Sequence, residues 1–447
     1  MKKFKNIFFS LYLISIIFIS CSNPNSDSKY HYVSTAKDSA LWGAKLRTVW
    51  KIKRETGFAS WPGLNDVAPL TIENKVIFLY HNFVHCVNSE TGETIWKERN
   101  PIVDTIYSLS NHANEMVLEN DRLYIIGNSG VYCRNVNNGS LIWSNYPIVI
   151  PDIDWIKNGI SDDAIFITSH SPFDPNILIK ISKADGKTVW SVGGLIGDFG
   201  EDKTASWPGP PCYYNGVVYV GATIFPGNGP IIYNGSVAAF DAVSGKRLWR
   251  KLIPNPDSST IGYYNWKSLS SNKSSFIIYG MNNGIIVPGG QAVIKMDFNG
   301  NIIWRKVIHI DGSVDQFQQN PLMYKGNYFV FNNGDGANCY VYSLNLETNN
   351  TNWIEYLKSD PKEQSTVINW AAQIDSSNNT LYKLTDGFEL FGIDITTGKI
   401  LWSTFLSTCE LEDGESIMYT GGYKVDGKRI YLTNRKSLLC MEKVDSL

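Results

Sequence analysis

Residues 87–96 read VNSETGETIW, and the rest of the chain repeats this phrase at nearly constant intervals. The later copies are RNVNNGSLIW at 134–143, ISKADGKTVW at 181–190, FDAVSGKRLW at 240–249, MDFNGNIIW at 296–304, LNLETNNTNW at 344–353 and IDITTGKILW at 393–402. Every copy ends on a tryptophan, and one more tryptophan of the series, Trp50, precedes the first copy. Successive tryptophans stand 46 to 59 positions apart, by subtraction of their residue numbers. A self-similar period of this length predicts a repeat architecture.

Each phrase has the composition of a tight turn between two strands. Glycine stands four residues before the tryptophan in six of the seven copies, and Asn349 takes that place in the remaining one. A turn residue with positive φ favours Gly, and Asn is the usual second choice. An Asp, Asn or Ser lies just upstream and can bond to the turn backbone; these residues are Asn88, Asn135, Ser182, Asp241, Asn345 and Asp394. The phrase therefore predicts a β-hairpin.

Two further strand-like runs precede each hairpin. In the fourth unit they begin at Val217 and at Ser236. We predict comparable runs at Lys75–Tyr80, Arg122–Gly127, Ala164–Ser169, Ser275–Gly280, Asn327–Asn332, Thr380–Leu384 and Arg429–Thr433. A repeat of about four strands at this period is typical of one propeller blade. The eight tryptophans are expected on the outermost strands, where each large ring can cover a junction between blades; they are Trp50, Trp96, Trp143, Trp190, Trp249, Trp304, Trp353 and Trp402.

The last repeat is incomplete, because no tryptophan follows the strand-like run that starts at Ser437. A strand of the right kind is available at the other end of the chain, in the Arg-Thr-Val-Trp-Lys stretch around Trp50. We predict that this N-terminal strand completes the C-terminal blade and closes an all-β, eight-bladed β-propeller. Closure would remove the exposed edges of an open sheet.

The phrase of Asp or Asn, then Gly, three residues and Trp resembles the tryptophan-docking motif of the pyrroloquinoline-quinone-like (PQQ-like) propeller repeat. The resemblance covers nearly all of the chain after Lys45. Eight copies are similar both to the quinoprotein dehydrogenases and to the BamB-type lipoproteins of outer-membrane assembly. The resemblance implies the fold, whereas the function must be argued separately, because one fold hosts many activities.

The composition suits one large ordered ring. The 447 residues are 43% hydrophobic and 13% aromatic, with a formal net charge of −2. This balance excludes a disordered chain, and it gives no sign of a nucleic-acid partner.

The N-terminus has the pattern of an export signal. Lys2, Lys3 and Lys5 precede an apolar run from Ile7 to Ile19, and Ser20 and Cys21 end a lipobox-like stretch. We predict a lipoprotein signal peptide at 1–20, lipidation of Cys21, a flexible tether at 21–40 and the propeller at 41–447. A plain signal peptide or an uncleaved anchor is the alternative. The predicted location is the cell envelope, lipid-anchored, at the outer membrane and facing the periplasm or the surface.

The remaining six cysteines do not suggest a disulfide framework. Cys86, Cys133 and Cys440 occupy matching third-strand positions in adjacent blades, which should be too far apart to bridge. We expect buried free thiols.

Five other tryptophans lie near the expected entries to inner strands: Trp61, Trp155, Trp207, Trp266 and Trp370. They could rim a central funnel and stack on a ligand or partner. They could equally fill the centre of the ring. Polar residues in the same segments, Gln373 among them, could bond a ligand or only solvate a loop. The interblade segments and the stretches Thr223–Gly235 and Met281–Gln291 are expected to form long loops on this face.

The sequence favours a non-catalytic role. Quinoprotein dehydrogenases typically carry an adjacent cysteine pair, and this chain has none. It also has no CxxCH haem site and no zinc-type histidine spacing. Neither PQQ nor calcium is therefore expected as a cofactor.

We expect a membrane-anchored propeller scaffold that binds a protein partner or client, in outer-membrane protein assembly if the BamB resemblance extends to function. Two alternatives stay open: a lipoprotein that binds a glycan or another small ligand, and a PQQ-dependent dehydrogenase.

Overall fold

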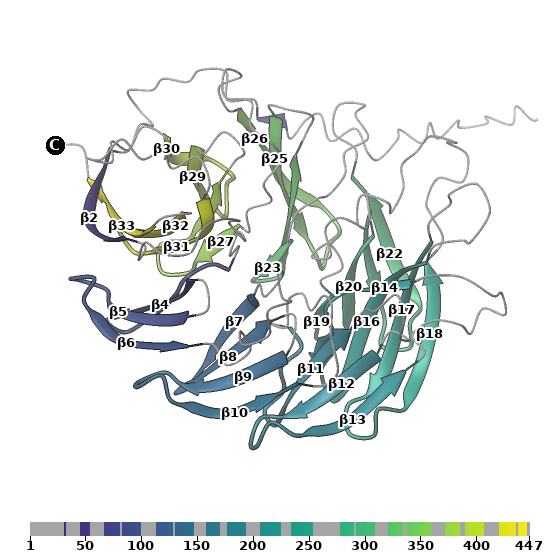
Figure 1. Cartoon of the computed structure of the whole chain (residues 1–447). Helices are drawn as coiled ribbons and strands as arrows, with labels where there is room; N and C mark the ends of the chain where they lie inside the picture. Colours follow the sequence, from purple (N-terminus) through teal and green to yellow (C-terminus); the bar gives the residue numbers. More distant parts are fainter. Residues whose placement is uncertain are drawn as a thin grey trace, which may run out of the picture.

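The computed structural model describes residues 31–32, 45–53, 67–80, 83–99, 113–127, 130–146, 158–169, 177–193, 206–224, 234–253, 278–289, 292–308, 321–333, 338–358, 372–384, 389–405, 420–434 and 437–444. In these ranges the chain forms eight β-sheets that follow one another around a ring (Figure 1). Each sheet is one blade. In blades 1 to 7 the strands of the repeat run from the centre of the ring to the rim in chain order, whereas in blade 8 the outermost strand comes from the start of the chain. No helix long and apolar enough to cross a bilayer occurs within the described ranges.

Blades 1 to 4 follow the predicted order. Blade 1 contains β3 (Leu70–Ile72), β4 (Lys75–Tyr80), β5 (Phe83–Asn88) and β6 (Thr94–Arg99). Blade 2 contains β7 (Ala113–Glu119), β8 (Arg122–Gly127), β9 (Gly130–Asn135) and β10 (Leu141–Asn145). Blade 3 contains β11 (Ala164–Ser169), β12 (Ile177–Ser182) and β13 (Thr188–Gly193). Blade 4 contains β14 (Ser206–Pro208), β15 (Cys212–Tyr214), β16 (Val217–Ile224), β17 (Asn234–Asp241) and β18 (Arg247–Ile253).

Blades 5 to 8 complete the ring. Blade 5 contains β19 (Tyr279–Met281), β20 (Gly284–Gly289), β21 (Ala292–Met296) and β22 (Ile302–Val307). Blade 6 contains β23 (Leu322–Tyr324), β24 (Asn327–Asn333), β25 (Asn338–Asn345) and β26 (Thr351–Lys358), and the two-residue β1 (His31–Tyr32) pairs parallel with β26. Blade 7 contains β27 (Gln373–Asp375), β28 (Thr380–Leu384), β29 (Glu389–Asp394) and β30 (Ile400–Phe405). Blade 8 contains β31 (Thr420–Asp426), β32 (Arg429–Asn434), β33 (Ser437–Val444) and β2 (Lys45–Lys53).

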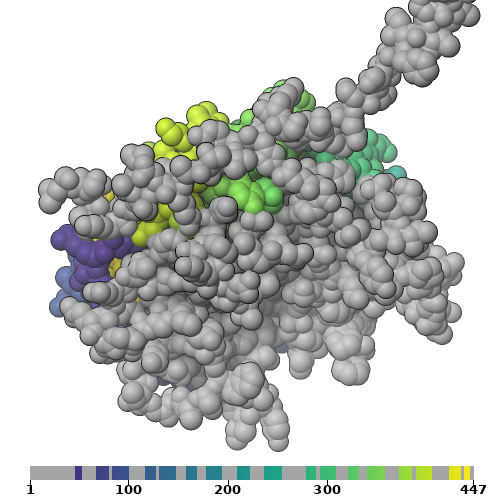
Figure 2. Space-filling view, turned by 90° about the horizontal axis from the view of Figure 1, so that it is seen from above, coloured from purple at the N-terminus to yellow at the C-terminus, as the bar shows by residue number. Residues whose placement is uncertain are grey.

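The two ends of the chain meet in blade 8, as predicted. β2 pairs antiparallel with β33, from Lys45 opposite Val444 to Lys53 opposite Ser437, with Trp50 opposite Cys440. In Figure 2, which views the ring from above, the purple residues of β2 lie against the yellow C-terminal strands. The N-terminal strand therefore supplies the outer strand of the last blade.

The hydrophobic core is divided among the junctions between blades. Eight clusters of buried side chains occur in the described ranges, and each combines residues from two neighbouring sheets. The cluster that contains Trp50 joins Tyr431 and Cys440 of blade 8 to Val76 and Phe78 of blade 1. Since this cluster lies between the last blade and the first, the ring is closed by packing as well as by strand pairing.

Two innermost strands depart from the simple pattern. In blade 3 the inner position holds only an isolated bridge between Ile160 and Ile165. In blade 4 it is shared by β14 and β15, which pair with opposite ends of β16.

The strand predictions hold in seven blades and fail in blade 5. The run Ser275–Gly280 was expected as the second strand, but that strand is β20, Gly284–Gly289. The stretch Met281–Gln291 is therefore not a loop. Its Gly, Asn and Pro content suggested a turn, whereas the Ile285–Val287 segment forms the ladder with Ile294–Met296. Burial of these β-branched side chains between two blades outweighs the local turn propensity.

Candidate functional site

Six of the eight repeat tryptophans donate a hydrogen bond across a junction between blades. The indole Nε1 of Trp96 donates to the carbonyl of Val136 at 3.0 Å, in the hairpin turn of the next blade. Equivalent bonds reach Ser89 from Trp50 at 3.0 Å, Lys183 from Trp143 at 3.0 Å, Ala242 from Trp190 at 3.3 Å, Phe298 from Trp249 at 2.7 Å and Ile395 from Trp353 at 2.9 Å. Each ring is thus held by packing and by one directional bond.

The turn glycines serve these contacts in two ways. Gly186 has φ of +73°, in the region that L side chains rarely adopt. A Cβ at Gly186 would also lie 2.5 Å from Cε3 of Trp143, and one at Gly92 would lie 2.8 Å from Cδ2 of Trp50. The glycine is therefore needed for the turn and for the close approach of the neighbouring indole. The sequence predicted only the first reason.

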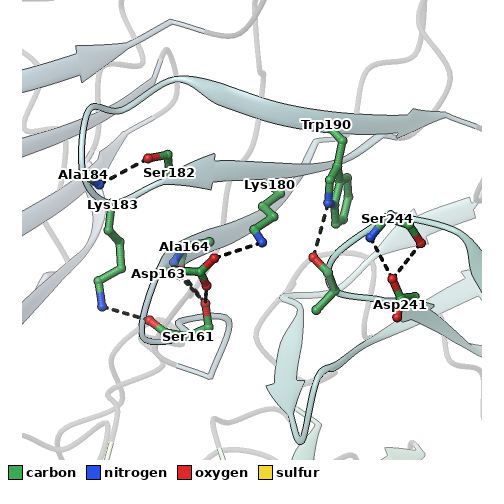
Figure 3. A network of polar contacts seen from close by, with 11 residues as sticks. Ser161, Asp163, Ala164, Lys180, Ser182, Lys183, Ala184, Trp190, Asp241 and Ser244 are labelled. Atoms are coloured by element: carbon green, nitrogen blue, oxygen red, sulfur yellow. Dashed lines mark hydrogen bonds and ion pairs between the residues drawn. The ribbon is translucent and has the colours of Figure 1, made fainter.

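The polar residues before the turns act as expected. The side-chain oxygen of Asn88 accepts bonds from the backbone N–H groups of Glu90 and Thr91, at 2.8 and 3.1 Å. Asp241 accepts from the N–H and hydroxyl of Ser244, at 2.7 and 2.6 Å (Figure 3). The Ser244 contact lowers the pKa of the Asp241 carboxyl. These bonds fix the turn that presents the acceptor carbonyl.

The residue before each tryptophan is a feature that the sequence analysis missed. In all eight outer strands the ladder register shifts between the tryptophan and the residue two positions before it, so the intervening residue is bulged. These residues are Val49, Ile95, Ile142, Val189, Leu248, Ile303, Asn352 and Leu401. All eight are exposed. A bulge re-aims the following side chain, which explains how each tryptophan points toward its neighbouring blade. In seven of the eight strands its sequence signal is an apolar residue that breaks the alternation, and the exception is Asn352.

Arginine reinforces two of the junctions. The carbonyl of Lys183 accepts from Trp143 and also from the guanidinium of Arg122, which starts β8. The carbonyl of Ser89 accepts from Trp50 and, at 2.6 Å, from Arg429, which starts β32. Charged donors make stronger hydrogen bonds than neutral ones.

Buried lysines extend the polar contacts of blade 3. The ammonium of Lys183 donates to the carbonyl of Ser161 at 2.8 Å and forms an ion pair with Glu119 of blade 2. Lys180 lies 3.2 Å from the carboxylate of Asp163 (Figure 3). Both lysine ammonium groups have partners, as buried charges require, and these contacts join strands of blades 2 and 3.

One junction lacks the indole bond. Nε1 of Trp304 is buried without a hydrogen-bond partner, and so is Oδ1 of Asn349 in the turn of blade 6. The carbonyl that would accept by analogy, that of Leu346, instead lies 3.4 Å from the ammonium of Lys295. Asn349 occupies the position of the turn glycine, with φ of +58°. The junction between blades 5 and 6 is therefore the least well satisfied of those described.

The predicted aromatic face is only partly within the described ranges. Trp207 lies in β14 opposite Thr223, on an inner strand. Trp61, Trp155, Trp266 and Trp370 lie outside the described residues. Gln373 is accounted for: it accepts from the N–H of Val425 at 3.1 Å and donates to the carbonyl of Tyr423, so it joins blade 7 to blade 8.

Cys86, Cys133 and Cys440 are free and buried, which confirms the prediction for these three, and Cys212 shares that state. Burial raises the pKa of the Cys86 and Cys133 thiols to about 11 and that of Cys212 and Cys440 to about 12. Protonated, inaccessible thiols are poor nucleophiles. Cys21, Cys409 and the side chain of Cys339 lie outside what the structure describes.

Few groups in the described ranges have the properties of a catalytic residue. No three His, Cys, Asp or Glu side chains there lie together in a way that could hold a metal ion. Glu355 is the exception among the carboxyls, because its burial raises its pKa to about 8 and its Oε1 has no partner. It lies on the outer strand β26. The absence of PQQ and calcium remains a prediction.

Comparison with known proteins agrees with this architecture. A family model described as "Outer membrane protein assembly factor BamB" matches residues 21–192 and 207–446. No curated protein matches the chain. Among solved structures, BamB from Moraxella catarrhalis is similar with a TM-score of 0.53 and 10% identity, over 90% of this chain and 99% of that one.

Other propellers are similar to the same extent. The quinohemoprotein alcohol dehydrogenase from Comamonas testosteroni has a TM-score of 0.58 and 12% identity, over 95% of this chain and 80% of that one. The C-terminal WD40 domain of Sif2 has a TM-score of 0.55 and 11% identity, over 90% and 100%. At such identities the structural likeness shows the fold alone.

Proposed function

Because the chain belongs to the family described as outer membrane protein assembly factor BamB, a family of PQQ-like β-propellers, we propose that it is a lipid-anchored scaffold in outer-membrane protein assembly. Its role is to hold a protein partner or client at the membrane rather than to catalyse a reaction. The observation that carries the proposal is the family match, which spans most of the chain, from residue 21 to residue 446 with one short gap.

The construction of the ring supports a scaffold. The clusters of buried side chains in the described ranges lie at the junctions between blades, and the indole hydrogen bonds repeat around the ring. A closed frame of this kind keeps its surface loops at fixed relative positions, which is what a binding module requires. The buried cysteines and paired lysines contribute to the frame and leave no reactive group exposed among them.

The proposed membrane attachment rests on the sequence. The stretch from Lys2 to Cys21 has the positive start, apolar run and terminal cysteine of a lipoprotein signal. These residues lie outside the described ranges. Acyl chains on Cys21 would hold the ring beside the bilayer while it stays in the aqueous phase. The periplasmic face of the outer membrane is the location that suits an assembly role.

We also propose that the ring works without PQQ or calcium. The sequence supplies no adjacent cysteine pair, the feature expected over a quinone ring in the dehydrogenases that share the fold. Mixing the purified chain with PQQ and calcium and then adding alcohols or aldose sugars should give no dye reduction. Turnover of any of these substrates would refute this part of the proposal.

Affinity capture from crosslinked membranes tests the main proposal. The tagged wild-type chain should bring down components of the β-barrel assembly machinery or unfolded barrel clients. A Cys21→Ser variant should lose lipidation and most of this capture, while a Ser22→Ala variant, which keeps the acceptor cysteine, should retain both. Capture from crosslinked membranes that contains neither assembly components nor barrel proteins would exclude the assembly role. Equal capture by Cys21→Ser and Ser22→Ala would exclude the anchor.

A further inference from the structure

Blades 4 and 5 present an unusual combination of exposed apolar and basic side chains on their outer strands and in the turns that precede them. Of the thirteen large hydrophobic side chains exposed in the described ranges, six belong to these two blades; they are Val243, Leu248, Leu252, Phe298, Ile302 and Ile303. Val243 is 77% exposed, and Leu248 and Ile303 are each 51% exposed. Apolar groups gathered in this way usually mark an interaction surface.

The two strands are also strongly basic. β18 reads RLWRKLI and β22 reads IIWRKV, so together they hold five Arg or Lys residues and no Asp or Glu. Arg247 and Lys251 are exposed, whereas the other three are half-buried, and Lys306 donates to the hydroxyl of Thr351 at 3.0 Å. The whole chain carries a formal net charge of −2, so this charge is local. Among the other outer strands, β10, β13 and β30 carry no charged residue, and β6 carries both signs.

The two strands form one continuous surface. Trp249 of β18 donates to the carbonyl of Phe298 in the turn before β22, at 2.7 Å. The stem of Lys251 passes close to Gly300 of the same turn. The ring of Phe298 stacks on Tyr214 of blade 4, with centroids 6.0 Å apart. In Figure 1, β18 and β22 lie on the same side of the ring.

The other basic outer strand lacks the apolar component. β2 reads KLRTVWKIK, but its Arg47 pairs with Glu442 at 2.7 Å. Val49, 37% exposed, is the one large apolar side chain that β2 exposes in the described ranges. β2 belongs to blade 8, which stands opposite blade 4 in the ring, so it supplies an internal comparison.

We propose that the outer strands β18 and β22 form a docking surface for an anionic phospholipid bilayer, so that the ring stands with the rim of blades 4 and 5 against the membrane. Arg and Lys side chains attract anionic headgroups, and their long stems allow the apolar neighbours to reach the interface. The inference rests on the membrane attachment proposed above, which places the ring beside a bilayer.

The bulges distinguish this occupant from an added β-strand. Leu248 and Ile303 are the bulged residues of their strands, so each ladder is interrupted one residue after the strand begins. A bulged edge is a poor template for pairing with another strand. A lipid surface can bind these side chains without pairing to the backbone of the strand. The absence of acidic residues on both strands further favours an anionic partner.

A depth measurement on the full-length chain in vesicles tests the proposal. A fluorophore is attached at Leu248→Cys or Ile303→Cys, and at the equivalent bulge positions Val49→Cys and Ile95→Cys across the ring. The vesicles contain phosphatidylethanolamine, phosphatidylglycerol and a nitroxide-labelled lipid as quencher. Quenching at the two test positions should exceed that at the two control positions by about threefold, and it should weaken at high salt or in phosphatidylcholine vesicles. Labelling of the parent chain gives the background.

Charge reversal supplies the second arm. The double variant Arg247→Glu with Lys251→Glu should bring quenching at a fluorophore on Ile303→Cys down to the control level. The matched control, Lys325→Glu with Lys399→Glu, changes the charge equally on blades 6 and 7 and should leave that quenching unchanged. Equal quenching at all four positions would overturn the proposal; it is also the result expected if the surface serves an acidic protein. Flotation of the chain with the vesicles reports attachment separately, so a failed anchor and a wrongly assigned surface give different results.

Discussion

The guanidinium of Arg47 lies 2.7 Å from the carboxylate of Glu442, although 395 positions of the sequence separate the two residues. The contact extends the ladder between β2 and β33 and lowers the pKa of the Glu442 carboxyl. Glu442 is on the surface, and an exposed pair of this kind contributes little stability by itself. The pair shows that the last blade is built from both ends of the chain.

Replacing a turn glycine should cost more than its backbone strain alone. Gly186→Ala would force a left-handed residue and push a methyl group toward Trp143, so we expect a loss of about 2–4 kcal/mol in the free energy of unfolding. Gly216 has φ of +79° but nothing within 4 Å of its would-be Cβ. Gly216→Ala should therefore cost only about 1 kcal/mol. Denaturant unfolding compares the two, and equal losses would show that the indole contact is not tight.

The indole hydrogen bond should be measurable by comparing two tryptophans. Trp96→Phe removes a ring segment and the 3.0 Å bond to Val136, whereas Trp304→Phe removes the ring segment alone. We expect the first variant to lose about 1–2 kcal/mol more than the second, since the buried carbonyl of Val136 would be left without its donor. Thermal and denaturant unfolding would measure the difference. A larger loss for Trp304→Phe would contradict the assigned bonding.

Restoring glycine at the exceptional turn should stabilise the ring. Asn349→Gly relieves a positive φ of 58° and removes a buried oxygen that has no partner. We expect a gain of about 1 kcal/mol. Asn215 has φ of 49° but is exposed, so Asn215→Gly should change stability by less than about 0.5 kcal/mol. Destabilisation by Asn349→Gly would mean that the asparagine makes a favourable contact.

Burial of Glu355 predicts a dependence of stability on pH. Its pKa rises from 4.5 when unfolded to about 8 in the folded chain, because its surroundings disfavour the charged form. Folding therefore takes up a proton between these values. The contribution is complete below pH 4.5 and is lost as the pH rises toward 8, at no more than about 1.4 kcal/mol per pH unit. Glu355→Gln should flatten this slope between pH 5 and 8, and a slope unchanged by the substitution would refute the assignment.

The features that depend on local residue chemistry, such as the turns and the strands, were mostly predicted from the sequence. Gly92 and Asn88 occupy their turn positions for the reasons inferred, and Trp50 joins the C-terminal blade as expected. It did not predict the bulge at Leu248, because a bulge exists only relative to the register of a partner strand. Nor could it predict that Trp304 lacks an acceptor, which depends on where Lys295 lies.

The site was less accessible to sequence reasoning than the fold. Gln373 was a candidate for ligand binding, but it bonds the backbone of the next blade, a role that requires knowing which segments are neighbours. The basic and apolar surface of β18 and β22 was also missed. Its residues belong to two repeats more than forty positions apart and become one surface only when the blades stand side by side.

Closure of the ring by the N-terminal strand underlies the whole account, and a disulfide trap tests it most directly. Arg47 and Glu442 are paired in register, at a separation that suits a disulfide, so Arg47→Cys with Glu442→Cys should crosslink on mild oxidation. Arg47→Cys with Lys443→Cys should not, because Lys443 stands opposite Leu46 and its side chain points to the other face of the sheet. Rapid crosslinking of the first pair alone, seen as a mobility shift that a reductant reverses, is the predicted result. No crosslink in the first pair, or equal crosslinking in both, would contradict the closed ring.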